Sequence, residues 1–212
     1  MKRMMLVFVS MAMVALSSVL SAEQNKLFEL VCHETDVDEV YNAINNVEWS
    51  NANLAAVRTL WRENLNKYSK VPRSASDVDM IRLALANVLI QATRHCRASG
   101  IEMNELHSFV LSKTKSEDLS VRGQATYLIG LAGDESDIPF LVSVVESEKE
   151  GYAEGGALSI SFIHSERGLD ALRNLVRKVS RPSLRVFLRD LVETYGAYPL
   201  KEQSEGCLNY LN

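Results

Sequence analysis

The feature that most constrains this fold is a helical pattern that recurs about every 32 residues from Leu119 onward. In 121–133, apolar residues follow helical spacing and are mixed with small ones, and after the turn 134–137 a second apolar stretch opens at Ile138. One short helical pair cannot bury its apolar stripe by itself, but stacked pairs share a continuous core. We therefore predict an all-α protein of stacked helical pairs.

Equivalent positions can be matched in successive copies of the pattern. A shift of 32 residues pairs Gly123 with Gly155, Ala125 with Ala157, Leu128 with Ile160, Leu131 with Ile163 and Gly133 with Ser165. After a gap of one residue, Ile138 and Leu141 pair with Leu169 and Leu172. A further 31 residues pairs Ala153, Ala157, Ile160 and Ser165 with Leu184, Leu188, Leu191 and Gly196. This third copy shows no clear second helix.

The stretch 119–196 resembles the short HEAT-like repeat family, of the kind first described in phycobilisome lyases. The residues that carry the resemblance are Val121-Arg122, Ala125, Leu128, Gly130, Leu131, Gly133-Asp134 and Ile138-Pro139-Phe140-Leu141. The resemblance implies an α-solenoid, a superhelix of HEAT-like helical pairs, that serves as a protein-binding scaffold. It does not imply lyase activity, because none of the matched positions is catalytic.

We assign the repeats to 116–196. Upstream of them, residues 23–115 are expected to form an N-terminal helical region, either of degenerate repeats or as a separate cap. Residues 197–212 are expected to form a C-terminal tail. The expected helices of the upstream region cover 24–33, 37–46, 51–68, 77–98 and 103–113. Ser50 is an expected N-cap, and Ser76 with Asp79 three residues later resembles a helix start. Apolar residues nearly all round 77–98 predict a central helix that its neighbours bury.

Residues 1–22 have the pattern of a secretory signal peptide. The basic start Lys2-Arg3 precedes the apolar run 6–16, and small residues lead to an expected cleavage after Ala22. The apolar core of about 15 residues is shorter than the ~20 that span a bilayer. The mature protein is therefore expected to be soluble, periplasmic or secreted, and without a membrane segment.

Cleavage would make an acidic chain more acidic. Removing 1–22 takes away two basic residues and no acidic ones, which changes the formal net charge from −4 to −6. A uniformly acidic surface argues against general binding of nucleic acid or anionic membranes. We therefore expect no nucleic-acid partner.

Cysteines could stabilise the exported protein. Cys32 and Cys96 each lie near the end of an expected helix, and thiols tend to pair in an oxidising compartment. A Cys32–Cys96 disulfide is the favoured one of three pairings, with Cys207 free or replacing one of the two. Their neighbours His33 and His95 make a tetrahedral zinc site the alternative. Adjacent helical residues point about 100° apart, which disfavours a Cys–His pair aimed at one metal. We predict no metal site.

No catalytic motif stands out. The neighbours His164, Ser165 and Glu166 are the residue types of a hydrolase triad, but sequence neighbours are rarely arranged as nucleophile, base and orienting acid. The sequence has no Gly-x-Ser-x-Gly, no His-Glu-x-x-His and no glycine-rich phosphate loop. We predict no catalytic residue and no cofactor.

Two charged groups are candidates for contact with a partner. Arginines recur every four places from Arg173 to Arg189, and Pro182 is expected to divide them between two helices. The basic candidates are Arg173, Arg177, Arg185 and Arg189, and the acidic candidates, at an inter-helix turn, are Asp134, Glu135 and Asp137. The arginines form either a solvated face paired with Asp170 and Asp190 or a cationic patch for an acidic protein or an anionic glycan.

These observations predict an exported helical-repeat protein that binds another protein. Its role would be that of an immunity-type inhibitor of a toxin or effector, or of an adaptor in the cell envelope. The alternative is a metal-dependent or hydrolytic enzyme that uses the Cys–His pairs or His164.

Overall fold

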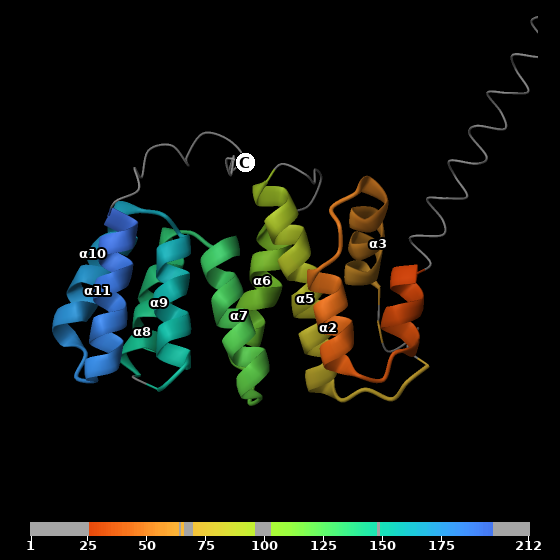
Figure 1. Cartoon of the computed structure of the whole chain (residues 1–212), viewed down its shortest axis with the longest axis horizontal. Coiled ribbons are helices and arrows are strands. Elements are labelled where there is room, and N and C mark those ends of the chain that lie inside the picture. The colour runs from red at the N-terminus through yellow and green to blue at the C-terminus, as the bar shows by residue number, and fades with distance from the viewer. Residues whose placement is uncertain (1–25, 64, 66–69, 96–102, 148, 197–212) are drawn as a thin grey trace, which may run out of the picture. The chain divides into compact units, whose positions relative to one another are not determined.

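The structure is a computed structural model that describes residues 26–63, 65, 70–95, 103–147 and 149–196 (Figure 1). Within these residues the chain is helical, with no β-strand, so the all-α prediction is confirmed. The chain divides into two compact units, residues 1–89 and 90–212. The expected signal peptide, 1–22, lies outside the described residues. None of the described helices is long and apolar enough to cross a membrane.

Side-chain caps set the helix starts in the first unit. Residues 26–33 are helical and are followed by α2 (Val37–Asn45) and α3 (Asn51–Arg62). As predicted, Ser50 caps α3, because its hydroxyl accepts a hydrogen bond from the Asn53 amide at 3.2 Å. The prediction that this helix runs to residue 68 is wrong: Glu63 is extended and ends it.

The long helix α5 (Ala75–Arg94) begins earlier than predicted. Its capping pair is Ser74 and Asp77, in which each side chain accepts from the other residue's backbone amide, at 3.1 and 3.0 Å. The predicted pair, Ser76 and Asp79, has the same residue types and spacing but lies inside the helix. Within the first unit α5 buries residues 81, 83–86, 88 and 89 almost completely, and the half-buried Asn87 donates to Asn45 of α2 at 2.7 Å.

The second unit contains the stretch in which the sequence predicts repeats. Its helices are α6 (Met103–Lys113), α7 (Leu119–Ala132), α8 (Ile138–Glu146), α9 (Tyr152–Phe162), α10 (Glu166–Lys178) and α11 (Pro182–Gly196), with a 3₁₀ turn, η1 (Glu135–Asp137), before α8. The helix over 103–113 agrees with the prediction. Pro182 begins α11 and thereby separates the two groups of arginines, as expected.

These helices form two rows. Helices α7, α9 and α11 lie side by side, and α8 and α10 form a second row that packs behind them (Figure 1). Helix α6, which the sequence places in the upstream region, packs against α7. Two matched pairs are buried alike, since Ala125, Ala157, Leu128 and Ile160 are all completely inaccessible, whereas Leu131 is buried and its match Ile163 is half-buried.

Small residues bring α7 and α9 together. A methyl group added to Gly130 would lie 2.4 Å from the Cα of Ser159, closer than two carbon atoms can approach. The Ser159 hydroxyl donates to the Thr126 carbonyl of α7 at 2.9 Å. At the C-terminal ends of the row, Arg94 donates to the Leu131 carbonyl at 2.8 Å and to the Phe162 carbonyl at 3.4 Å. These contacts fix the two helices at close range.

Candidate protein-binding surfaces

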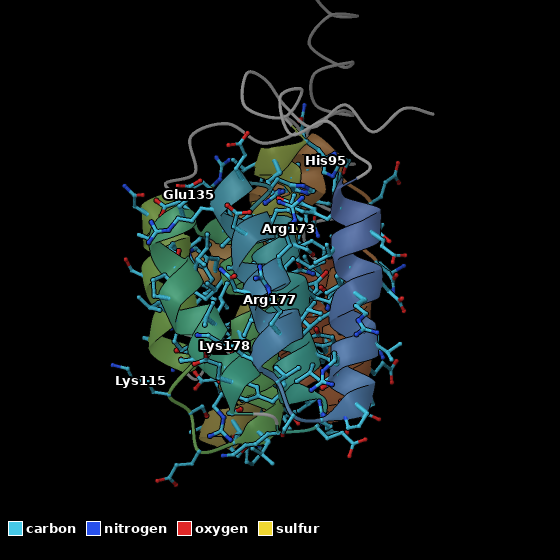
Figure 2. The ribbon with its side chains drawn as sticks, turned by 90° about the vertical axis from the view of Figure 1, so that its left-hand side faces the viewer. His95, Lys115, Glu135, Arg173, Arg177 and Lys178 are labelled. Carbon is cyan, nitrogen blue, oxygen red and sulfur yellow. The ribbon has the colours of Figure 1, made fainter. Side chains whose placement is uncertain are left out.

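Helix α10 presents the clearest charged surface of the second unit. Its N-cap is Ser165, whose hydroxyl accepts from the Gly168 amide at 3.1 Å. Leucines at 169, 172 and 175 are buried, so helical spacing turns the residues between them outward. Arg173, Arg177 and Lys178 are exposed and follow one another along the helix (Figure 2). We call these three residues the basic face.

The side chains of the basic face make only weak contacts with other side chains. Arg173 pairs with Asp170 and Lys178 pairs with Glu146, each at 3.1 Å, and Arg177 donates to Asn174 at 3.4 Å. Every group in the two ion pairs is at least 42% exposed. Exposed ion pairs of this kind contribute about 0–1 kcal/mol, so a partner can displace them at little cost.

The other two basic candidates are not part of this surface. Arg185 is half-buried and donates to the Val179 carbonyl at 2.6 Å, so it closes the turn between α10 and α11. It is therefore a turn-stabilising residue rather than the surface residue we expected. Arg189 is exposed on α11. The structure thus keeps Arg173 and Arg177 together and separates Arg185 from them.

Arg181, between the two helices, forms an ion pair with Glu154 of α9. Burial by itself raises the pKa of Glu154, but the hydrogen bond and charge of Arg181, together with backbone hydrogen bonds, make the net shift downward. This pair holds the α10–α11 turn against α9.

The acidic candidates divide in the same way. Asp134 and Glu135 are exposed, and hydrogen bonds from Ser136 lower the pKa of Asp134. Asp137 is 7% exposed: it accepts from the Asp134 amide at 3.0 Å, and the Nε2 atom of His107 lies 3.0 Å from its Oδ2. Asp137 therefore ties η1 to α6 and is not available to a partner. The spacing in the sequence did not distinguish it from its exposed neighbours.

A second surface escaped the sequence analysis because it lacks charge. No residue of α9 is exposed, and its outermost residues, Gly155, Leu158 and Phe162, are half-buried. The half-buried uncharged positions of α7 include Gly123, Gln124 and Tyr127. The rings of Tyr127 and Phe162 meet edge-to-face with centroids 5.4 Å apart. We call these six residues the uncharged face. The sequence could have revealed it, because Lys and Glu are absent from these outward helical positions.

The cysteine and metal predictions reach beyond the described residues. Cys32 is a half-buried free thiol, and burial, with a smaller effect of Glu29, raises its pKa. Cys96 and Cys207 lie outside the described residues, so the Cys32–Cys96 disulfide stays a prediction. Neighbouring His33 pairs with Glu29 at 2.9 Å. Among the described residues no group of three or more His, Cys, Asp or Glu could hold a metal ion.

His164 lies in the turn between α9 and α10 and has a positive φ of 51°, which is rare outside glycine. Its ring stacks on that of Tyr195 with centroids 5.3 Å apart. Burial, with a smaller effect of the Arg94 charge, lowers the pKa of His164, and burial raises the pKa of Tyr195 to about 12. The neighbouring Ser165 hydroxyl is the α10 cap described above. His164 and Ser165 thus contact different partners.

The chain matches no protein-family model, no curated protein and no solved structure at a significant level.

Proposed function

We propose that this chain is an exported, non-enzymatic helical-repeat protein that binds an acidic protein partner through α10. The observation that carries the proposal is the basic face: Arg173, Arg177 and Lys178 are exposed on a helix whose leucines are anchored in the core. A cationic patch on a chain of net charge −4 favours a partner surface of opposite sign, because complementary charges speed encounter and orient the complex.

The proposal includes an α-solenoid of HEAT-like pairs for the second unit. Three features support it: the matched residues Ala125, Ala157, Leu128 and Ile160 are all completely buried, α7, α9 and α11 share one row, and α8 and α10 share the other. The outer positions of α11 also support it, since most of them are polar: Arg189, Asp190 and Glu193 are exposed there, together with Val186. Terminal units of repeat arrays carry a polar outer face of this kind.

Export is proposed from residues 1–22 alone, and it places the mature chain in the periplasm or outside the cell. In that compartment we propose one of two roles, an immunity-type inhibitor of a toxin or effector or an envelope adaptor. A tight one-to-one complex with a toxin, encoded by a neighbouring gene, would favour the inhibitor. Turnover among several envelope partners would favour the adaptor.

Capture of the partner tests the proposal. The mature protein is immobilised and exposed to envelope extract, and each protein that it retains is identified and then titrated against three purified forms. The wild type and Lys115→Glu, an exposed charge on the α6–α7 turn, should bind equally well. The double variant Arg173→Glu/Arg177→Glu should lose at least tenfold in affinity, and added salt should weaken the wild type. Binding that survives the double charge reversal would refute the proposed surface.

The alternative function is a metal-dependent or hydrolytic enzyme. It would use the Cys–His pairs or His164, which is half-buried and in a strained backbone conformation. Elemental analysis of the purified mature protein separates the two proposals. Stoichiometric zinc would favour the enzyme, whereas a Cys32–Cys96 disulfide in a peptide mass map would remove its metal site.

A further inference from the structure

Helix α10 carries some of its outward charges in an ordered stripe. Its members are all exposed and, at about 100° per residue, lie within about 60° of one another on the side away from the buried leucines: Glu166, Asp170, Arg173 and Arg177. The stripe is acidic in its first half and basic in its second. We call these four residues the charged stripe.

The other exposed residues of α10 lie to one side of the charged stripe. Arg167, Asn174 and Lys178 are about 80–120° from Glu166 around the helix. Lys178 pairs with Glu146 of α8 at 3.1 Å. The charged stripe therefore shares two arginines with the basic face but does not include Lys178.

Within one molecule the charged stripe places like charges on neighbouring turns. Glu166 and Asp170 are four residues apart, and so are Arg173 and Arg177, so the two members of each pair repel each other. The acidic and basic halves meet at Asp170 and Arg173, which pair at 3.1 Å although both side chains are more than half exposed. A second surface with the opposite order of charges would neutralise both like-charge pairs.

The charged stripe is complementary to its own reverse. From Glu166 to Arg177 the steps are four, three and four residues, which read the same in both directions. In an antiparallel pair of α10 helices with a twofold axis at the middle of the stripe, Glu166 faces Arg177 of the second copy and Asp170 faces its Arg173. The symmetry repeats both contacts. Such a pair also sets the two helix dipoles antiparallel, which is favourable.

The size and composition of the charged stripe set the strength of such a pair. Exposed ion pairs contribute little each, and salt screens them. One helix from each copy also buries less than the roughly 1,200 Å² of a standard stable interface. We therefore expect a reversible dimer that forms at high protein concentration and low salt.

We propose that α10 pairs antiparallel with α10 of a second copy through the charged stripe. This pairing covers the basic face. Self-association and binding of the acidic partner exclude each other, because both use Arg173 and Arg177. The pairing itself does not depend on the existence of that partner.

Sedimentation equilibrium of the purified mature chain measures the self-association. In salt of about 10 mM the screening length is about 30 Å, and at about 1 M it is about 3 Å. We expect the wild type to shift from monomer towards dimer as its concentration rises in low salt, and to be monomeric in high salt. A wild type that stays monomeric at every concentration in low salt would overturn the proposal.

Two double variants with the net charge of the wild type test the register. Glu166→Arg/Arg177→Glu keeps opposite charges in every facing pair, so its association constant should stay within about twofold of the wild type. Asp170→Arg/Arg177→Glu makes every facing pair alike in charge and should lower the constant at least tenfold. Equal association of the two variants would show that this register is wrong.

Mixing variants separates pairing from misfolding. Glu166→Arg/Asp170→Arg has an all-basic stripe, and Arg173→Glu/Arg177→Glu has an all-acidic one. Each should be monomeric alone, and an equimolar mixture should form the mixed dimer. Failure of the mixture to associate, with both variants folded by circular dichroism, would overturn the proposal.

The all-basic variant also separates this proposal from the one for the acidic partner. It keeps Arg173 and Arg177, so it should still bind that partner while it no longer pairs with itself. Loss of partner binding in the wild type would refute the proposed function alone, since sedimentation needs no second protein.

Discussion

Consecutive helices of the second unit, α9 and α10, have nearly the same length and opposite surfaces. Helix α9 has no exposed residue and one charged side chain, which is paired with Arg181. Helix α10 has seven exposed residues, and its buried side is a row of leucines. Helix α9 is packed between α7, α8, α10 and α11, whereas α10 lies at the margin of the second row.

The comparison separates positions that hold the second unit together from positions that only face water. Helices α7 and α9 contact each other through their backbones at Gly130 and Ser159, where an added methyl group must displace a helix. In α10 the outward side chains can change without disturbing the leucines beneath them. The core row should therefore be sensitive to mutation and the basic face tolerant of it.

The largest effect is expected for Ala125→Asp in α7. Ala125 is completely buried, so the substitution places a carboxylate without a partner in the core and should cost about 3–5 kcal/mol. Urea denaturation followed by circular dichroism measures the change. The control is the neighbouring substitution Gln124→Asp, whose half-buried position on the outer side should make it much milder. Equal losses in the two variants would contradict the assignment of the core side of α7.

Gly130→Ala should destabilise by about 1–3 kcal/mol, because its methyl group would collide with the backbone of Ser159 and push α7 from α9. Gly123→Ala is the matched change on the same helix: its methyl group meets no atom within 4 Å, and it should stabilise by about 0.5–1 kcal/mol. Thermal unfolding of both variants gives the sign. A neutral Gly130→Ala would show that close packing does not set the distance between these helices.

The turn that joins α9 to α10 should make stability depend on pH. The pKa of His164 is lowered in the folded protein, so the unfolded chain takes up the proton more readily. Stability from this group is present above its unfolded pKa, about 6.5, and is lost as pH falls through the lower folded value. His164→Asn, which tolerates a positive φ, should flatten the stability curve between about pH 7 and 5.

Unfolding in urea at a series of pH values tests this prediction. The quantity to compare is the slope of the free energy of unfolding against pH rather than its absolute value, because the variant also loses the contact with Tyr195. Carboxylates with lowered pKa, such as Asp134 and Glu154, lose their contribution at lower pH in both proteins and do not affect the comparison. Parallel curves for wild type and variant would show that His164 does not titrate differently on folding.

The smallest effect on stability is expected for Arg173→Glu/Arg177→Glu on α10. Both side chains are exposed and bound only by weak surface contacts, so the free energy of unfolding should change by no more than about 0.5 kcal/mol per site. The same urea titration measures it. A large loss would mean that the basic face is part of the folded framework, and the contrast between α9 and α10 would disappear.

Several elements of this structure could be read from local sequence alone. Ser50 caps its helix because a hydroxyl before an apolar-periodic stretch satisfies a backbone amide, and Pro182 begins a helix because its ring cannot continue one. The prediction that Ser76 and Asp79 start α5 was wrong because Ser74 and Asp77 have the same spacing two residues earlier. The choice between them depends on where the chain enters the packed unit.

The candidate surfaces were only partly predictable. Arg173 and Arg177 are exposed as a helical wheel requires, since the leucines of α10 define its inner side. Arg185 and Asp137 belong to the same charged groups in the sequence as the exposed candidates. In the structure, however, Arg185 turns inward to the Val179 carbonyl and Asp137 turns inward to His107. The hydrogen-bonding groups that they meet come from other elements or from across a turn, so residue type and spacing could not reveal them.

Sequence by itself therefore determined the helical class and several helix ends, because helical period and capping are local properties of a few neighbouring residues. Only the tertiary structure decided which charges face water, how closely α7 approaches α9, and that their outer side is uncharged. Those features depend on which helices pack against one another, and burial is a property of the packed row rather than of any one segment.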